Sequence, residues 1–429
     1  LRPRTDLGPR ASGSSVREAQ RCRATEPCLP EGYLYIDSRV HDYTGSPHLL
    51  PLLTTVPSQA KKKSLKMVQD PRETQLDLAS ANRVAIFYEN GGPEKISIKE
   101  LDNVKQSDLS PGEVLVRILF TGVCHSDLHA LQGDWPAPTK LPLIGGHEGA
   151  GVVVAVGPGS EDYVQVGDRV GIKWIADACL NCEYCRLSHE INCPQYKPSG
   201  YAVDGTFQQY VRHTARYLTK IPDDVALDQA ASILCAGVTI YRALKEAHLQ
   251  PGNWVVIPGS GGGLGHLGVQ YAQNAGLRVI GIDTGEDKKK MSLELGCEVF
   301  VDFKSTSDVA TTIKKATGGI GAHAAVVAAA SAAAYELALD YIRPRGTLVI
   351  VGMPNSILPL SIFKTVLCTH KIVGSAVGNR QDAHEALEIA SRGKVKVHYT
   401  LKGLSDLPNV FEDMINGRIA GRIVLDVDK

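Results

Sequence analysis

Short apolar runs broken by glycine and proline fill the chain from Arg83 to about Asp223. Runs of this length, bounded by turn residues, are typical of β-strands. They lie at residues 114–120, 151–156, 168–174 and 207–211. The pattern predicts an all-β, barrel-like domain.

The pattern of apolar and polar residues changes after Ala230, where strand-like and helix-like segments alternate. It predicts strands at residues 254–257, 278–282, 298–301 and 347–351, with helices beyond Gly262 and over residues 286–295. This alternation gives βαβ units and a parallel sheet, so the fold class is α/β. After Ile372 the pattern is mixed again, and we expect the tail to pack back on the first domain.

Residues 1–80 are rich in arginine, proline and serine and show no period of 2 or 3.6, so we expect them to lack a packed fold. Because the chain begins with Leu and becomes regular only after Met67, we expect a missing start or a sequence that begins upstream of the start. The early arginines would suit a cleaved targeting peptide, but Asp6, Glu18 and Glu26 fit an acid-poor transit sequence badly. The expected location is the cytoplasm, with the mitochondrial matrix as the alternative.

Charge and composition favour a small-molecule partner. Lys plus Arg and Asp plus Glu number 46 each, so no net field draws the chain to nucleic acid or anionic membrane. No run approaches the roughly 20 apolar residues that a membrane-spanning helix needs. Four of the ten cysteines crowd into residues 179–193, which favours metal thiolates and a reducing compartment over disulfides.

A glycine-rich turn follows the apolar run at residues 255–257. It comprises Gly259, Ser260, Gly261, Gly262, Gly263, Leu264 and Gly265. Apolar residues then recur at helical spacing, and Gly276 stands where that helix would end. Free backbone N–H groups at a helix N-terminus, with no side chains in the way, can dock a pyrophosphate. The spacing of Gly259, Gly262 and Gly265 is one residue longer than the usual fingerprint, and a plain loop is the alternative.

Asp283 strengthens the dinucleotide interpretation. It follows the predicted strand 278–282, about 20 residues after the glycines, where a carboxylate accepts hydrogen bonds from the adenosine ribose. The same charge would repel a 2′-phosphate, so the sequence predicts NAD over NADP. The alternative is that Asp283 caps the helix beginning near Glu286. Lys288 belongs either to a solvated helix face or to the ribose site.

Two groups of residues have the chemistry of zinc ligands. Cys179, Cys182, Cys185 and Cys193 are spaced closely enough to surround one tetrahedral ion, which predicts a closed, structural site. Three further candidates, Cys124, His147 and Cys235, lie far apart in sequence. If they meet, two thiolates and an imidazole leave a fourth position open, as in catalytic zinc sites. Otherwise each is an ordinary core residue.

From about Ala81 to Lys429 the chain resembles zinc-containing medium-chain alcohol dehydrogenases. The likeness rests on Cys124-His125-Ser126-Asp127-Leu128-His129, Gly146-His147-Glu148-Gly149, the four-cysteine segment and the glycine turn. It is nearest to the fungal, yeast-type tetrameric enzymes, as suggested by residues 133–136, 171–174, 199–201, 207–210 and 235–237. The resemblance implies a GroES-like β-rich catalytic domain over residues 81–232, joined by residues 372–429. It also implies a Rossmann doubly wound cofactor domain over residues 233–371, and a homotetramer.

The same resemblance implies two zinc ions per chain, NAD as cofactor and an alcohol or aldehyde as substrate. Cys124, His147 and Cys235 would hold the catalytic zinc, with Glu148 beside it and able to exchange for water. His125 and Ser126 would approach cofactor and substrate. Asp283 and Lys288 would bind the ribose, and the cofactor would be lined by Val351, Met353, Ser375, Val377 and Arg422. Ser126 stands where Thr is common, a mild departure, whereas Leu131 and Gln132 leave the outer pocket wall open.

The chemistry also requires a path for the alcohol proton. Ser126 can only relay that proton, because a serine hydroxyl is too weak a base to keep it. His129 is the predicted end of the relay, since imidazole titrates near about pH 6.5; a plain surface histidine is the alternative. Trp135 and Trp174 are predicted to narrow the pocket toward ethanol-sized primary alcohols, unless they are ordinary core aromatics.

Two competing functions remain at this stage. A polyol or aryl-alcohol dehydrogenase of the same superfamily would share the zinc and cofactor features. A non-enzyme would use the four-cysteine segment as a binding module and the glycine turn as a nucleotide sensor. The set Cys124, His147 and Cys235 argues against the second, and zinc content separates them, because the module needs one ion and the enzyme two.

Overall fold

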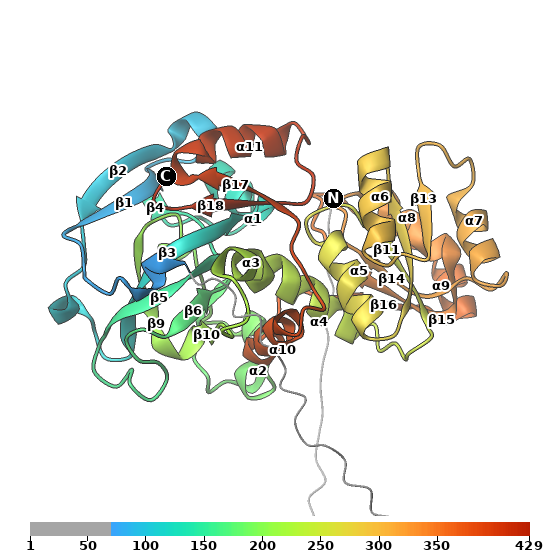
Figure 1. Cartoon of the computed structure of the whole chain (residues 1–429). Coiled ribbons are helices and arrows are strands. Elements are labelled where there is room, and N and C mark those ends of the chain that lie inside the picture. Colours follow the sequence, from blue (N-terminus) through green and yellow to red (C-terminus); the bar gives the residue numbers. More distant parts are fainter. Residues whose placement is uncertain (1–69) are drawn as a thin grey trace, which may run out of the picture. The chain divides into compact units, whose positions relative to one another are not determined.

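The computed structural model describes residues 70–429 (Figure 1). The prediction for residues 1–69 therefore lies outside the described residues. At residues 70–74 the chain is packed, contrary to the prediction, whereas the side chains of residues 75–80 are exposed. A 3₁₀ turn, Pro71–Thr74, begins there, and its Arg72 contacts Asp426 at 2.7 Å and Asp428 at 2.8 Å. Ion pairs with residues so distant in sequence leave no trace in local periodicity.

The β-rich part contains most of the strands. Their bounds are β1 Ala81–Phe87, β2 Ser97–Asp102, β3 Glu113–Val123, β4 Leu143–Ile144, β5 Gly149–Val156, β6 Arg169–Ile172, β7 Ile175–Asp177, β8 Lys197–Pro198, β9 Tyr210–Thr214, β10 Thr219–Lys220, β17 Tyr399–Gly403 and β18 Arg422–Asp426. The main sheet runs β10-β6-β5-β3-β18-β17, and the long strand β3 also pairs with β9. Its helices are α1 His125–Gln132, α2 Glu183–Arg186, α3 Leu227–Ser232 and α11 Leu407–Ile415.

A six-stranded parallel sheet forms the second part (Figure 1). Its strands are β11 Trp254–Pro258, β12 Arg278–Asp283, β13 Val299–Asp302, β14 Ala322–Val327, β15 Ile342–Ile350 and β16 Lys371–Gly374. The order β13-β12-β11-β14-β15-β16 is the 3-2-1-4-5-6 order of dinucleotide-binding folds, which confirms the predicted fold class. Its helices are α4 Val238–Glu246, α5 Gly265–Asn274, α6 Glu286–Glu294, α7 Val309–Ala316, α8 Ala332–Tyr341, α9 Ile362–Cys368 and α10 Arg380–Ser391.

Both faces of the parallel sheet are covered, which is why its strands are apolar without alternation. Val255 and Ile257 of β11 pack with Leu267 of α5 on one face. Val256 packs with Ile313 of α7 on the other face. Each fully buried aliphatic side chain of this kind contributes about 1.5–3 kcal/mol. The glycine turn is thereby held at the end of a rigid strand.

The tail of the chain returns to the β-rich part. β18 pairs antiparallel with β3, and β17 pairs with β18. The parallel sheet itself extends to Gly374, slightly past the expected limit at residue 371. The domain boundaries given above stay a prediction. Within residues 70–429, no helix is both long and apolar enough to cross a membrane.

Candidate active site and metal centres

Cys124, His147, Glu148 and Cys235 meet at one point. Their ligand atoms all lie within 4.8 Å of one another, and His147 Nε2 is 3.2 Å from Cys235 Sγ. Cys124 stands at the junction of β3 and α1, the pair 147–148 precedes β5, and Cys235 lies in a π-helical turn, Ile233–Gly237, between α3 and α4. The open question of whether these distant residues converge is thus answered by the tertiary structure.

Asp127 holds this group in place, and sequence reasoning missed it. Its Oδ1 is 2.7 Å from His147 Nδ1, and its Oδ2 accepts the backbone N–H of Cys124 at 2.9 Å. Both side chains of the Asp127–His147 pair are almost completely buried. A carboxylate on Nδ1 leaves Nε2 to face the cysteines, the orientation a metal-binding imidazole needs. The position of Asp127, three residues after Cys124, was its only signal in the sequence.

The electrostatics of the group suit a cation. A hydrogen bond from the Cys235 thiol, together with His147, holds the pKa of Cys124 well below its usual range. Burial alone would lower the pKa of His147, but the Asp127 carboxylate and Cys124 raise it well above normal. The negative charges that raise the pKa of His147 would also stabilise a metal ion at the same place. Two thiolates and an imidazole are also the donors that zinc prefers, so the residues fit a zinc ion.

Glu148 links the first cysteine–histidine group to Arg422. Its side chain is fully buried, and burial raises its pKa to about 7. One carboxylate oxygen accepts a hydrogen bond from Arg422, and the other has no hydrogen-bond partner. A carboxylate with a spare oxygen inside a group of thiolates can turn toward a metal ion or away from it. Its position is compatible with the exchangeable role that the family resemblance implies.

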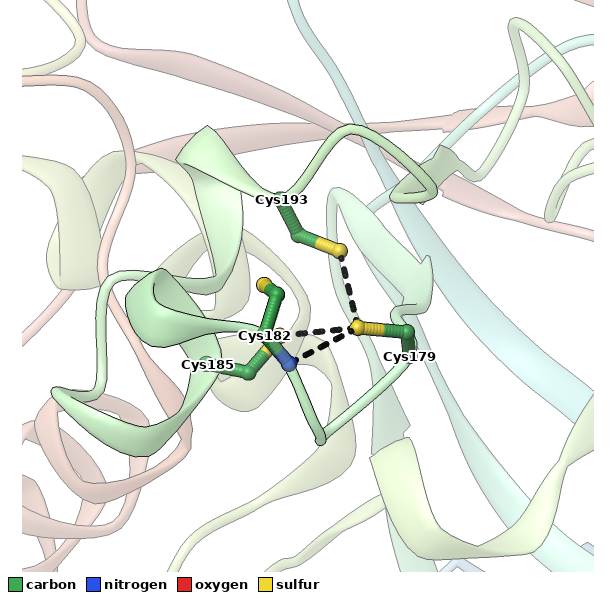
Figure 2. Close-up of side chains that lie close together, drawn as sticks. All are labelled: Cys179, Cys182, Cys185 and Cys193. Carbon is green, nitrogen blue, oxygen red and sulfur yellow. Dashed lines mark hydrogen bonds between the residues drawn. The ribbon is translucent and has the colours of Figure 1, made fainter.

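The four clustered cysteines also converge, and Figure 2 shows their side chains gathered together. Cys179 Sγ lies 3.5 Å from Cys193 Sγ and 3.9 Å from Cys185 Sγ. A tetrahedral ion with zinc–sulfur bonds of about 2.3 Å would separate its ligands by about 3.8 Å. Backbone N–H groups of residues 181 and 182 point at Cys179 and lower the pKa of its thiol to about 6. The group therefore fits a closed zinc site.

The cysteine segment also contacts the start of α10. Asn379 donates to the carbonyl oxygen of Ser188 at 3.1 Å, and Arg380 Nε lies 3.3 Å from a carboxylate oxygen of Glu190. Glu190 is buried, so the Arg380 guanidinium compensates a carboxylate charge that would otherwise be unpaired inside the protein. The four-cysteine segment thus packs against α10 of the second part of the chain.

The glycine turn has the predicted context of strand, turn and helix. β11 ends at Pro258, Gly259 takes a positive φ of +83°, and α5 begins at Gly265. A Cβ on Gly265 would overlap the carbonyl oxygen of Gly259, so this position must be glycine. The backbone N–H of Gly262 donates a 2.9 Å hydrogen bond to the carbonyl oxygen of Gly259, which keeps the turn close to α5. Leu264 occupies the N-cap position.

Arg422 lies over this turn. A Cβ on Gly263 would come within 3.2 Å of its guanidinium Nη1, and its buried Nε has no hydrogen-bond partner. An unpaired buried donor beside a helix N-terminus suits an anionic group such as a pyrophosphate. Because Arg422 also contacts Glu148, one side chain connects the glycine turn with the first cysteine–histidine group.

Asp283 ends β12 beside the turn. Its carboxylate accepts the backbone N–H groups of Gly261 at 3.0 Å and Thr284 at 2.9 Å, and it contacts Lys288 Nζ at 3.2 Å. The N-cap residue of α6 is Gly285, so the helix-cap alternative for Asp283 does not describe its contacts. Lys288 is not part of a purely solvated face, since it is paired with this carboxylate.

The predicted relay residues lie on the first turns of α1. His125 is exposed, and Ser126 Oγ lies 3.8 Å from Cys124 Sγ. His129 Nδ1 is 2.9 Å from Asp134 Oδ1, and its ring stacks on Trp135 at 5.1 Å. His129 is therefore fixed by Asp134 and Trp135 and is not a free surface histidine. Asp134 is a second carboxylate that sequence reasoning did not single out.

Aromatic rings line the space next to His147. Trp174 contacts the His147 ring edge-on at 4.9 Å, and Trp135 packs on Trp174 at 5.9 Å. Tyr201, which the sequence did not single out, joins both tryptophans at 5.7 and 6.0 Å. These aromatics surround one side of the imidazole and also belong to a hydrophobic core cluster, so the pocket role of the two tryptophans stays a prediction.

Three of the five residues assigned to the cofactor by resemblance line a cavity of about 430 Å³. They are Val351, Met353 and Ser375, and the cysteine segment closes the opposite side. Val377 lines a smaller space with Cys235 and Trp174, and its φ of +48° is rare for a β-branched residue. The buried Ser375 Oγ has no hydrogen-bond partner and is free for a ligand.

Comparison with known proteins agrees with this geometry. The profile of the alcohol dehydrogenase GroES-like domain matches residues 110–223, and that of zinc-binding dehydrogenases matches residues 263–392. The chain is 52% identical to the alcohol dehydrogenase of Schizosaccharomyces pombe over 346 residues, which covers 80% of this chain and 97% of that protein. This chain belongs to the zinc-binding alcohol dehydrogenase family.

Two further members of the alcohol dehydrogenase family support the assignment. Alcohol dehydrogenase 1 of Emericella nidulans is 48% identical over 319 residues, covering 74% of this chain and 91% of that protein. The crystal structure of the alcohol dehydrogenase from Aeropyrum pernix superposes with a TM-score of 0.73 at 31% identity, covering 80% of this chain and all of that one. The resemblance to zinc-containing alcohol dehydrogenases, and to fungal ones in particular, is thereby confirmed.

Proposed function

We propose that this alcohol dehydrogenase interconverts small primary alcohols and aldehydes with NAD, using one zinc ion at Cys124, His147 and Cys235. A second zinc ion would be held by the four-cysteine group. The observation that carries the proposal is Arg422, which contacts both Glu148 of the first group and Gly263 of the glycine turn. The expected metal and the expected pyrophosphate would then lie on two sides of one guanidinium.

NAD fits the residues around the turn. Asp283 would accept the adenosine ribose hydroxyls and repel a 2′-phosphate, with Lys288 beside it. The N–H groups at the start of α5 and Arg422 would receive the pyrophosphate. Val351, Met353, Ser375 and Val377 would then surround the nicotinamide end. NAD would supply the hydride acceptor, and these residues would hold it in position.

A zinc ion bound by these residues would withdraw electrons from the alcohol oxygen and make the alcohol proton easier to lose. His147, oriented by Asp127, and the two cysteines would hold that ion. Ser126 would take the proton and pass it on toward His129, whose partly exposed ring can exchange it with solvent. Asp134 keeps the His129 ring in place. Trp135 and Trp174 would exclude water and leave room for a short chain only.

A set of steady-state rates tests this function. We expect the fastest turnover with ethanol and NAD, slower turnover with a branched secondary alcohol, and little with sorbitol or with NADP. The zinc content should be about two ions per chain. Fastest turnover on sorbitol would replace our proposal by a polyol dehydrogenase. A single zinc ion per chain would favour the binding-module alternative.

We further propose a homotetramer in the cytoplasm. Supporting the assembly, large apolar side chains are exposed on and before α9, the helix that precedes the edge strand β16 in the chain: Ile357, Ile362, Phe363, Val366 and Leu367. Exposed apolar patches of this kind mark association surfaces. The cysteines of the described part are all free, in keeping with a reducing compartment. Light scattering from the purified protein tests the assembly, and a monomer mass would contradict it.

A further inference from the structure

His266 is the second residue of α5, directly after the glycine turn, and its side chain is completely buried. Its Nδ1 lies 3.0 Å from the carbonyl oxygen of Gly262, so Nδ1 carries the hydrogen and donates. Nε2 is then an acceptor, and the backbone N–H of His398 donates to it at 3.2 Å. Burial lowers the pKa of His266 to about 4, which keeps the ring neutral and this pair of bonds intact.

His398 belongs to an extended segment, Lys396 to His398, which we call the strap. The strap leads from α10 into β17 and lies outside the strands of the sheets. Side chains satisfy its backbone instead. Gln270, one turn beyond His266 on α5, exchanges two hydrogen bonds with Lys396, at 2.8 and 2.9 Å. From the other side, Gln229 of α3 accepts the N–H of Val397 at 2.7 Å.

The strap in turn positions Arg422. The carbonyl oxygen of His398 accepts the backbone N–H of Arg422 at 3.0 Å. The guanidinium then reaches back over Gly263, next to the Gly262 carbonyl to which His266 is bonded. The contacts form a closed ring: glycine turn, His266, strap, Arg422 and glycine turn again. Losing one member of such a ring frees the others to shift.

We propose that His266 is a positioning residue for the dinucleotide, because it ties the strap to α5 and thereby fixes Arg422 over the glycine turn. The inference rests on the proposed NAD-linked activity and assigns a role within it. His266 contacts neither the metal group nor the relay residues, so its effect is on cofactor binding. The hydride step itself should be little affected once the cofactor is bound.

Two substitutions of His266 separate the strap bond from the bond within the turn. His266→Asn can reproduce the donor at Nδ1 but cannot reach the strap. His266→Gln can place an acceptor near Nε2 and keep the strap bond. We expect His266→Asn to raise the Kd for NADH, measured by nicotinamide fluorescence, by about tenfold, the cost of one buried hydrogen bond. His266→Gln should restore most of the affinity.

Kinetics and matched controls complete the test. With His266→Asn, the KM for NAD should rise about tenfold while kcat changes by less than about twofold. Gln270→Ala loosens the strap from the same helix and should shift Kd in the same direction, which keeps the test valid if His266→Asn folds poorly. Gln229→Ala loosens the strap from α3 and should lower Tm while leaving the Kd for NADH near the native value.

The outcomes are distinct. If His266→Asn binds NADH as tightly as the native enzyme, or if Gln229→Ala weakens binding equally, His266 is only a structural residue and the inference is wrong. If the native enzyme itself binds no NADH, the proposed NAD-linked function fails, and this inference fails with it.

Discussion

At the scale of single residues, Asp127 shows how a buried carboxylate can organise a site without belonging to its ligand set. It fixes the ring of His147 from one side and the backbone of Cys124 from the other. Asp134 acts comparably on His129, at the exposed rim. In both cases the carboxylate selects which imidazole nitrogen faces the chemistry.

Replacing Asp127 by Asn should weaken zinc binding at the first group by about 10- to 100-fold, because a neutral amide orients the imidazole less firmly and removes a negative charge. Competition with a chromophoric chelator measures this affinity. Asp134→Asn is the matched control, since it alters a histidine-bound carboxylate outside the metal group. Unchanged zinc affinity in Asp127→Asn would rule out the positioning role.

At the scale of elements, the glycine turn works because β11 and α5 approach through their backbones. Only hydrogen fills the space between Gly265 Cα and the Gly259 carbonyl. Gly268, one turn further along α5, differs in kind, because a Cβ there would meet the side chain of Ile240 and not a backbone atom. The two positions therefore separate a backbone requirement from a packing preference.

Gly265→Ala should weaken NADH binding by more than about tenfold, since the turn must open to relieve the overlap and its N–H groups then lose their alignment. Gly268→Ala should retain NADH binding, with a modest loss of thermal stability as Ile240 repacks. Fluorescence titration and thermal melts measure both quantities. Equal NADH affinity in the two variants would show that the close backbone approach is not needed for binding.

At the scale of the whole molecule, stability should fall in mild acid because neutral histidines are buried. His213 is 4% exposed, its Nδ1 lies 3.1 Å from the carbonyl oxygen of Thr214, and its Nε2 has no partner. Burial lowers the pKa of His213 to about 4. In the unfolded chain a histidine titrates near about 6.5, so between these values the unfolded state binds more protons. Stability is therefore lost as the pH falls through this window.

From pH 7 to pH 5, His213 should lower the free energy of unfolding by about 2 kcal/mol. His213→Asn keeps a donor for the Thr214 carbonyl but cannot take up a proton. The free energy of unfolding of this variant should therefore fall by about 2 kcal/mol less than that of the native protein over the same pH interval. Urea unfolding at the two pH values measures the difference. An identical pH dependence in the variant and the native protein would contradict the assignment.

Features that depend on neighbours in sequence were predictable from the sequence alone. The spacing of Cys179, Cys182, Cys185 and Cys193 and the run Gly259 to Gly265 predicted a closed thiolate group and a strand–turn–helix junction, and both are found. The position of Asp283 beside the glycine turn was predicted from the number of residues between it and the glycines. Hydrophobic period likewise gave the alternating strands and helices of the parallel sheet. A loop or a βα unit is specified by residues a few positions apart, so local chemistry is sufficient.

Other features were decided only by the tertiary structure. Cys235 meets His147 across 88 positions of sequence, and Arg422 meets Glu148 across 274. Such contacts arise when β3, β18 and α3 pack together, and no local pattern encodes that arrangement. Family resemblance named the residues of both candidate metal groups in advance, but gave no role to Asp127 or the strap. Their roles rest on hydrogen bonds between buried groups, which exist only once packing has excluded water.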